Sequence, residues 1–279
     1  MLAQRLQVAW RVPWGRAQTV CLSLSAILGL ACAGFVRCNR QSTFVREGKE
    51  SWEYRNREKM ADIATETAIA VRLASPLDAE GFPHEAAWEN APPIRFDADW
   101  RGQNSDPQRG TKVRLIWSAD TLYMKFEARY RVITVFSDAE ASGRRDHLWD
   151  RDVCEAFLQP NPAELRRYKE FEIAPNGFWI DLDIAPGEKH DLQSGLRRRV
   201  KVDEPSKTWR AELALPMKSL TSHFDPAEVW RVNFYRVEGE AEPRFYSAWR
   251  PTGTPQPNFH VPEAFGGLVF TETGGKIRR

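Results

Sequence analysis

Residues 168–183 read YKEFEIAPNGFWIDLD, in which apolar and polar side chains alternate on both sides of Asn176-Gly177. Asn-Gly between two alternating runs is the strongest short-range signal of a β-hairpin, because both residues tolerate the positive φ of a tight turn. With a two-residue loop, Glu172 lies opposite Asp181. Alternation then places all four carboxylates of the stretch on one face of the hairpin.

In the same register Glu170 faces Asp183, and like charges that face each other destabilise a hairpin unless something compensates them. Three explanations for how these facing charges are compensated remain open. The basic run Arg197–Arg199, with Lys201, follows the hairpin and would neutralise the face. A bound calcium ion prefers clustered carboxylate oxygens. Paired carboxylates about 5 Å apart also suit a retaining glycosidase. We favour neutralisation by the arginines, because runs of charged residues usually form solvated faces.

Period-2 alternation between turn residues recurs from about residue 64 onward. Short pieces near His84–Asn90 and Met217–Leu220 are the best helix candidates. Many strands without long crossover helices are typical of antiparallel sheets. The sequence therefore predicts an all-β fold, an antiparallel two-sheet β-sandwich of jelly-roll or immunoglobulin-like type with a few short helices. The predicted strands are Lys112–Ser118, Thr121–Arg129, Asp152–Leu158, Tyr168–Ala174, Phe178–Asp183, Arg199–Val202, Trp209–Leu215, Val229–Glu238, Phe245–Trp249 and Gly267–Phe270.

The N-terminal part carries an export pattern. Three arginines precede an apolar run, residues 20–36, and no acidic residue occurs before Glu47. This order, followed by the small-residue site Ala31-Cys32-Ala33, is typical of a secretory signal peptide. An uncleaved membrane anchor is the close alternative, because the run of about 17 residues is marginal for a full span. Either way we expect the rest of the chain to be exported, in the periplasm, outside the cell or tethered to the membrane.

The domain organisation follows from this pattern. We expect a signal peptide or anchor at 1–33, a polar linker at 34–60 and one β-sandwich domain at 61–275. The 279 residues hold 40 Lys and Arg against 38 Asp and Glu, a charge of +2 that is too small to indicate a nucleic-acid partner. Without the three signal arginines the chain is close to neutral. Cys154 is expected to be a buried thiol, with pairing to Cys38 left open.

The segment 146–160, DHLWDRDVCEAFLQP, runs from a polar loop into a strand. Trp149 sits among charges at the start of that strand, and Glu155 shares a face with Val153 and Phe157. A carboxylate between apolar neighbours is costly unless it meets a partner. An aromatic plane beside a fixed acid suits a sugar, whereas the plain alternative is a loop Trp that covers the end of the sandwich.

Five motifs in order extend this pattern over the chain. They are Trp149-Asp150-x-Asp152-x-x-Glu155-x-Phe157, Tyr168…Phe171…Gly177…Asp181, Trp209-x-x-Glu212-x-x-x-Pro216, Trp230-x-x-Asn233-x-x-Arg236 and Phe259-His260-x-Pro262-x-x-Phe265-Gly266. This string resembles the family 9 carbohydrate-binding modules and their family-9-like relatives over about residues 69–272. The resemblance implies a β-sandwich.

The resemblance also implies a site in which two aromatic residues clamp a terminal sugar. By motif position Trp149 matches the first aromatic residue and Glu155 its neighbouring carboxylate. The second aromatic position falls at Phe259, where well-understood members carry Trp, and Glu172 falls where they carry a sugar-contacting Arg. Asp150 and His260, next to the two aromatic residues, complete the expected ligand-binding set. Structural calcium also occurs in the family, so the resemblance strengthens the interpretation of the acidic residues as a calcium site.

We therefore expect a non-catalytic carbohydrate-binding protein of polysaccharide utilisation. Its partners would be oligosaccharide or polysaccharide ends and glycoside hydrolases encoded elsewhere. A haem-binding electron-transfer module of related fold is one alternative, with Met124 and either His147 or His260 as axial ligands. A glycoside hydrolase that uses the paired carboxylates is another.

Overall fold

The computed structural model describes residues 67–164 and 166–272, all within one compact unit of the chain, Ser51–Arg279. The expected signal or anchor at 1–33, the linker at 34–60 and Cys38 lie outside the described residues. Among the residues that are described, no helix is long and apolar enough to cross a membrane.

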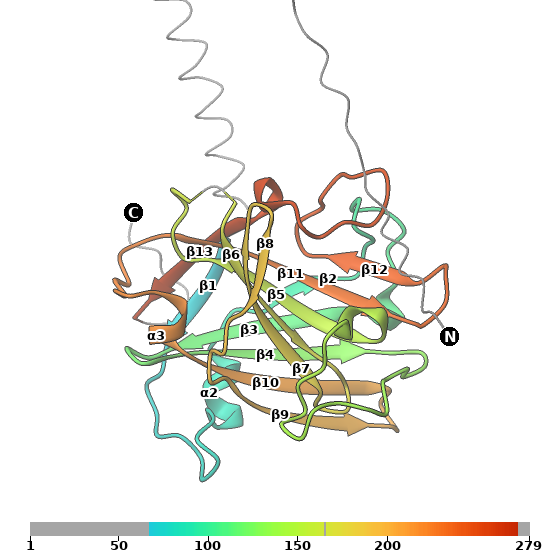
Figure 1. The fold of residues 1–279 in the computed structure, drawn as a ribbon. Helices are drawn as coiled ribbons and strands as arrows, with labels where there is room; N and C mark the ends of the chain where they lie inside the picture. The colour runs from blue at the N-terminus through green and yellow to red at the C-terminus, as the bar shows by residue number, and fades with distance from the viewer. Residues whose placement is uncertain (1–66, 165, 273–279) are drawn as a thin grey trace, which may run out of the picture. The chain divides into compact units, whose positions relative to one another are not determined.

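Strands dominate the described part of the chain (Figure 1). They are β1 (Thr67–Arg72), β2 (Ile94–Phe96), β3 (Thr111–Trp117), β4 (Thr121–Arg129), β5 (Val153–Gln159), β6 (Tyr168–Ile173), β7 (Trp179–Ala185), β8 (Glu188–Asp191), β9 (Arg197–Asp203), β10 (Thr208–Pro216), β11 (Trp230–Glu238), β12 (Phe245–Ala248) and β13 (Gly266–Thr271). The helical pieces are α2 (Glu85–Glu89), α3 (Met217–Leu220) and the 3-10 turns η1 (Pro107–Arg109), η2 (Leu148–Asp150) and η3 (Pro262–Ala264). The ten predicted strands and both predicted helices are confirmed, with shifts of one or two residues at most ends, whereas β1, β2 and β8 were not predicted.

The strands form one hydrogen-bonded sheet in the order β8-β7-β6-β5-β11-β13-β1-β3-β4-β10-β9, with β12 on β11 and β2 on β3. The predicted purely antiparallel, two-sheet arrangement is therefore wrong at β1, which pairs parallel with both β13 and β3. Parallel neighbours need a long connection. The segment between β1 and β3 supplies one, and it contains α2 and β2.

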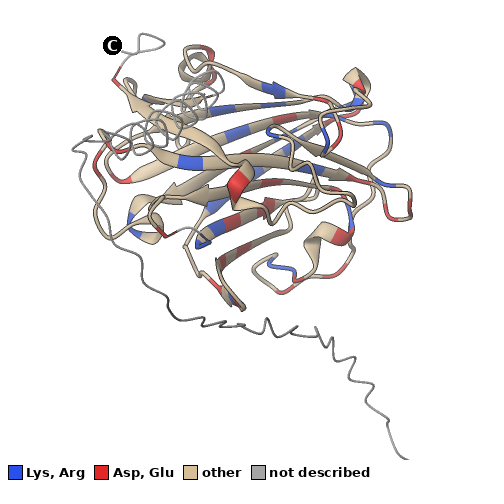
Figure 2. Cartoon of the chain, turned by 90° about the horizontal axis from the view of Figure 1, so that it is seen from above, with Lys and Arg blue, Asp and Glu red and all other residues tan. Residues whose placement is uncertain are grey.

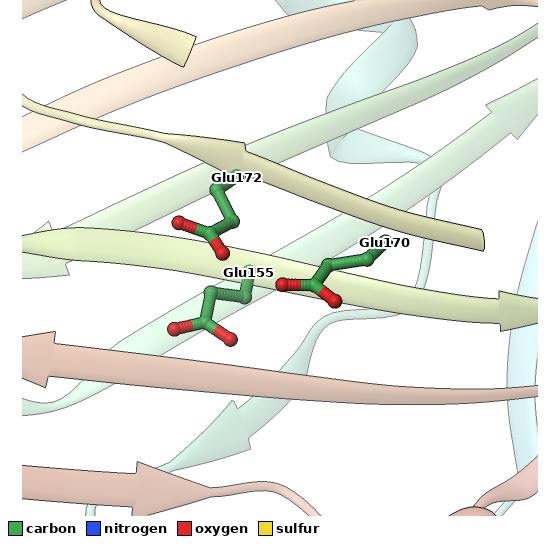
Figure 3. Close-up of side chains that lie close together, drawn as sticks. All are labelled: Glu155, Glu170 and Glu172. Atoms are coloured by element: carbon green, nitrogen blue, oxygen red, sulfur yellow. The ribbon is translucent and has the colours of Figure 1, made fainter. Parts of the chain in front are cut away.

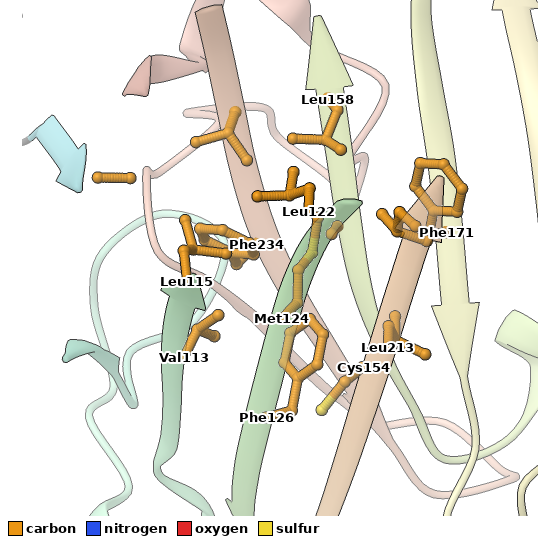
Figure 4. Packing of buried hydrophobic residues seen from close by; sticks show 14 of the residues in the cluster. Val113, Leu115, Leu122, Met124, Phe126, Cys154, Leu158, Phe171, Leu213 and Phe234 are labelled. Carbon is orange, nitrogen blue, oxygen red and sulfur yellow. The ribbon is translucent and has the colours of Figure 1, made fainter. Parts of the chain in front are cut away.

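The sheet curls so that β5, β6 and β11 of the first layer pack against β3, β4 and β10 of the second layer (Figure 1). The alternating apolar residues of these strands meet between the layers (Figure 4). Phe126 and Phe234 make an edge-to-face contact across this core, with ring centroids 6.1 Å apart. Cys154 is confirmed as a buried free thiol in the same core, where burial raises its pKa to about 12.

The β6–β7 hairpin has a different register from the predicted one. Its loop is longer: Ala174 N donates to Phe178 O at 2.8 Å, and Gly177 takes the left-handed conformation with φ 84°. Such three-residue loops end in a left-handed residue, usually Gly. Glu172 consequently lies opposite Ile180 instead of Asp181.

A shift of one residue moves every side chain of a strand to the other face. Glu170 and Glu172 therefore share the outer face of the first layer, whereas Asp181 and Asp183 face the other way. The prediction of four carboxylates on one face is wrong. Asp183 is paired with Arg167 at 2.7 Å.

The basic run Arg197–Arg199 does not lie beside the acids of the hairpin. Arg197–Arg199 belong to β9, which pairs with β10 at the opposite edge of the sheet. Arg199 contacts Asp78 and Glu212, and Arg198 donates to backbone oxygens, including Gly177 O at 2.7 Å. The predicted neutralisation of the hairpin acids by these arginines is thus wrong. Basic and acidic segments are otherwise interspersed over the body (Figure 2).

Candidate functional site

The outer face of the first layer carries a second apolar cluster and, beside it, an open pocket of about 190 Å³. We call it the Trp149 pocket. It draws its walls from β5, β6, β8 and β11 and from the loops around Trp149 and Phe259. The lining residues are Trp149, Glu155, Phe157, Glu170, Glu172, Lys189, Val237, Arg244, Tyr246, Pro257, Asn258, Phe259 and His260.

Trp149 lies in η2, just before β5 begins, and is half-buried. Arg244 Nη1 donates to the backbone oxygen of Trp149 at 2.8 Å, which anchors the turn. The ring contacts His147, with centroids 4.7 Å apart, and Lys189 Nζ lies 4.4 Å from its centroid. A cation at this distance is attracted to the aromatic face. Lys189 therefore occupies one side of the predicted stacking surface.

Phe259 lines the same pocket from a loop near the C-terminal end of the domain. It is 8% exposed and stacks on Tyr235, with centroids 4.2 Å apart and planes at 13°. Tyr235 also donates its hydroxyl hydrogen to Phe259 O at 3.0 Å. The two expected aromatic residues are thus brought to one pocket, but Phe259 is packed into its wall, so Trp149 offers the freer ring.

Three glutamates meet in this pocket (Figure 3). Glu155 of β5 lies directly opposite Glu172 of β6, and Glu170 follows two residues away on the same face. One carboxylate oxygen from each lies within 4.8 Å of the others. The three residues are 2%, 2% and 1% exposed for Glu155, Glu170 and Glu172. We call them the glutamate triad.

The triad lacks the partners that buried acids usually have. Glu155 Oε1, Glu170 Oε2 and both carboxylate oxygens of Glu172 have no hydrogen-bond partner. Burial raises the pKa of Glu155 well above its ordinary value, and the charge of Glu170 adds to the effect. Burial likewise raises the pKa of Glu172, with further contributions from the charges of Glu155 and Glu170 and from the close approach of the Glu170 carboxyl group. Both glutamates therefore hold protons more tightly than exposed ones.

The remaining predicted residues differ in their placement. His260 lines the pocket, and its Nδ1 lies 2.6 Å from the Tyr168 hydroxyl oxygen and 4.0 Å from Glu170 Oε2. Asp150 does not line the pocket: its half-exposed side chain lies 3.9 Å from His147 Nδ1. The structure therefore does not bring Asp150 to the lining of this pocket, and a role of Asp150 in ligand binding stays a prediction.

Sequence reasoning missed several pocket residues, among them Glu170, Lys189, Arg244 and Tyr246. Glu170 was recognised only as a hairpin acid, although its spacing of two from Glu172 puts both on one face. Lys189 lies on β8, a short exposed strand that was not predicted. Arg244 and Tyr246 reach the pocket from the β11–β12 connection and β12, where no local pattern marks them.

The haem ligands of the alternative hypothesis are not brought together. Met124 is fully buried between the two layers, whereas His260 lies on the outer face of the first layer. His147 is exposed, with its ring against Trp149. Neither His shares a space with Met124, so the predicted axial pairs are wrong.

Comparisons with known proteins bear on the same part of the chain. The family model described as "Carbohydrate family 9 binding domain-like" matches residues 78–273. A protein of Arthroderma benhamiae named "Extracellular protein" is 25% identical over 194 residues, covering 63% of this chain and 85% of that protein.

Solved structures share the fold. A Bacteroides uniformis protein has a TM-score of 0.58 at 16% identity, covering 74% of this chain and 99% of that one. A family 9 carbohydrate-binding module from Caldicellulosiruptor kristjanssonii, solved with glucose and with cellotriose, has a TM-score of 0.51 at 16% identity, covering 77% of this chain and 100% of that one. The family match spans most of the chain and agrees with the observed fold. The chain belongs to the carbohydrate family 9 binding domain-like family.

Proposed function

We propose that the chain is a non-catalytic carbohydrate-binding protein whose Trp149 pocket takes the end of an oligosaccharide or polysaccharide. The observation that carries the proposal is the half-buried Trp149 ring beside buried carboxylates in one open pocket. A tryptophan face packs against the apolar C–H face of a sugar, while oxygen acceptors take hydrogen bonds from its hydroxyl groups. Family membership supports the same reading.

The dimensions of the pocket support a small ligand. Its volume of about 190 Å³ is below the roughly 300–1,000 Å³ typical of pockets for drug-sized ligands. One sugar ring at a chain end is a suitable occupant. Arg244 and Asn258 line the pocket as donors, and the triad and Asn258 supply acceptors. Trp149 would provide the stacking plane, with Phe259 closing the wall.

We further propose that the protein is exported and acts in polysaccharide utilisation, holding saccharide ends for glycoside hydrolases encoded elsewhere. The basic and apolar N-terminal pattern supports export. The relative from Arthroderma benhamiae, which is named an extracellular protein, supports it independently.

Glycoside hydrolysis is the competing use of the same carboxylates, because the triad oxygens lie within 4.8 Å of one another. A retaining glycosidase needs one protonated and one ionised carboxyl, and hence two environments that drive their pKa values apart. Burial raises the pKa of both Glu155 and Glu172. The pair therefore favours binding over catalysis, and turnover of aryl glycosides by the purified chain would reverse that preference.

Calorimetric titration with a panel of oligosaccharides that includes glucose and cellotriose tests the proposal. Aromatic stacking with few net hydrogen-bond gains predicts modest affinity. Trp149→Ala should weaken binding at least tenfold, since the ring is worth roughly 1.4 kcal/mol or more. Trp179→Ala is the matched control, because Trp179 is also half-buried but lies outside the pocket. The proposal fails if no sugar binds, or if both variants bind as the wild type does.

A further inference from the structure

Binding of a neutral sugar does not by itself account for the glutamate triad. Hydroxyl groups need donors and acceptors, whereas three carboxylates buried together repel one another and lose hydration. Lys189 and Arg244 line the same pocket, but neither makes an ion pair or hydrogen bond with a triad oxygen. The arrangement calls for a positively charged ligand.

The spacing of the triad fits a calcium-sized ion. Calcium binds oxygen ligands at 2.3–2.6 Å, so two ligands of one ion lie at most about 5 Å apart. The triad offers one oxygen from each of Glu155, Glu170 and Glu172, all within 4.8 Å of one another. All three donors are carboxylate oxygens, which suit calcium, magnesium or manganese over softer metals.

A second observation points to a ligand independently of this proximity. The three residues are at least 98% buried, four of their carboxylate oxygens lack a hydrogen-bond partner, and all three residues line the Trp149 pocket. Buried acceptors normally have partners, so each exception calls for an explanation. A pocket that connects such oxygens to solvent gives an ion its entry path.

A shared proton is the simplest alternative. Glu170 and Glu172 are close enough for a hydrogen bond between their carboxyl groups, which requires one of them to be protonated. That arrangement satisfies one oxygen of each group at most and leaves Glu155 Oε1 without a donor. A divalent cation satisfies all three groups at once, displacing the proton.

We propose that Glu155, Glu170 and Glu172 bind one divalent cation of the calcium type in the wall of the Trp149 pocket. Three carboxylates supply only part of the six to eight oxygens that calcium takes. The remaining positions face the pocket, and there two neighbouring hydroxyl groups of the saccharide end occupy two of them, with water in the others. This second step rests on the proposed function, whereas the metal site does not.

The metal site is tested on the full chain after treatment with a chelator. Calorimetric titration with calcium chloride alone should show one site, and calcium should raise the melting temperature of the wild type. Glu172→Gln and Glu155→Gln should each weaken calcium binding at least tenfold. Glu212→Gln is the matched control, because Glu212 is a buried glutamate of the second layer with its own arginine. Absence of calcium binding, or equal binding by all three variants, overturns the site.

Saccharide titrations with calcium and with chelator separate the two proposals. Sugar binding that requires calcium supports both steps. Sugar binding that is equal under both conditions, alongside calcium binding, retains the metal site and overturns hydroxyl coordination. Sugar binding without any calcium binding overturns the metal site and leaves the proposed function standing. Calcium binding without binding of any sugar leaves the metal site standing and overturns the proposed function.

Discussion

Glu212 and Glu172 are buried glutamates on the outer faces of the two layers, and their surroundings differ. Glu212, on β10 beneath α2, accepts a hydrogen bond from Arg199 Nη2 at 2.9 Å and one from Trp88 Nε1 at 3.3 Å. Glu172, on β6, faces Glu155 and has no hydrogen-bond donor on either oxygen. The first carboxylate is satisfied within the fold, and the second is not.

The same contrast appears in the neighbouring charges. Beside Glu212, the buried Lys125 is paired with Glu85 at 2.6 Å, so cations and anions are matched under the helix. Beside Glu172 the charges on the neighbouring strand positions are the acids Glu155 and Glu170, and Lys189 lines the same pocket without an ion pair to them. A buried acid that is paired contributes to the fold, whereas buried acids that are unpaired cost free energy and are retained where a ligand uses them. The comparison therefore separates a face whose acids are satisfied within the fold from the face on which we propose binding.

Exchange of each carboxylate for an amide should have opposite effects on stability. Glu212→Gln should lower the free energy of unfolding by about 1–3 kcal/mol, because it removes a charged acceptor from Arg199 and Trp88. Glu172→Gln should leave the free energy of unfolding of the metal-free protein equal to or above that of the wild type, because it removes a buried charge that has no partner. Urea denaturation at neutral pH with chelator measures both. If Glu172→Gln lowered the free energy of unfolding as much as Glu212→Gln does, the proposed difference between the two faces would be contradicted.

The pH dependence of stability should carry the signature of the triad. Burial raises the pKa values of Glu155 and Glu172 above the ordinary 4.5, so the folded chain binds their protons more tightly than the unfolded chain does. Their contribution to stability is complete below that ordinary value and is lost as the pH rises through the folded-state pKa values. Without metal, the wild type should therefore lose more stability between about pH 5 and pH 8 than Glu155→Gln/Glu172→Gln does. Parallel curves for the two proteins, obtained by urea denaturation at each pH, would contradict this.

The smallest expected effect concerns access to Trp149. Lys189→Ala removes the ammonium group that lies 4.4 Å from the Trp149 ring centroid. An exposed cation–π contact is worth about 0.5–1 kcal/mol, so freeing the ring should tighten saccharide binding roughly two- to fivefold. Lys207→Ala is the control, because Lys207 makes a similar contact with Tyr130 outside the pocket. Weaker binding by Lys189→Ala would instead identify Lys189 as a ligand contact.

The local sequence pattern was sufficient to predict the strands and part of the pocket. Alternation placed Leu122, Met124 and Phe126 in the core, and it placed Glu155 on the same face as Phe157, as the structure shows. These features depend on a period of two residues within one strand, and they do not require knowledge of the strand's partners. The resemblance of the spaced motifs to the family identified Phe259, which lies in a loop distant in sequence, as a residue of the site.

Tertiary structure alone decided which acids meet and which are neutralised. The three-residue loop sets the β6–β7 register, which places Asp181 and Asp183 on the face opposite to that of Glu170 and Glu172. Pairing of β6 with β5 places Glu170 and Glu172 beside Glu155. Pairing of β9 with β10 places Arg199 beside Glu212 and away from the acids of the hairpin. The sequence by itself determined the strands and their faces, because alternation is local. Register and strand neighbours depend on loop geometry and long-range pairing, and these assembled the glutamate triad.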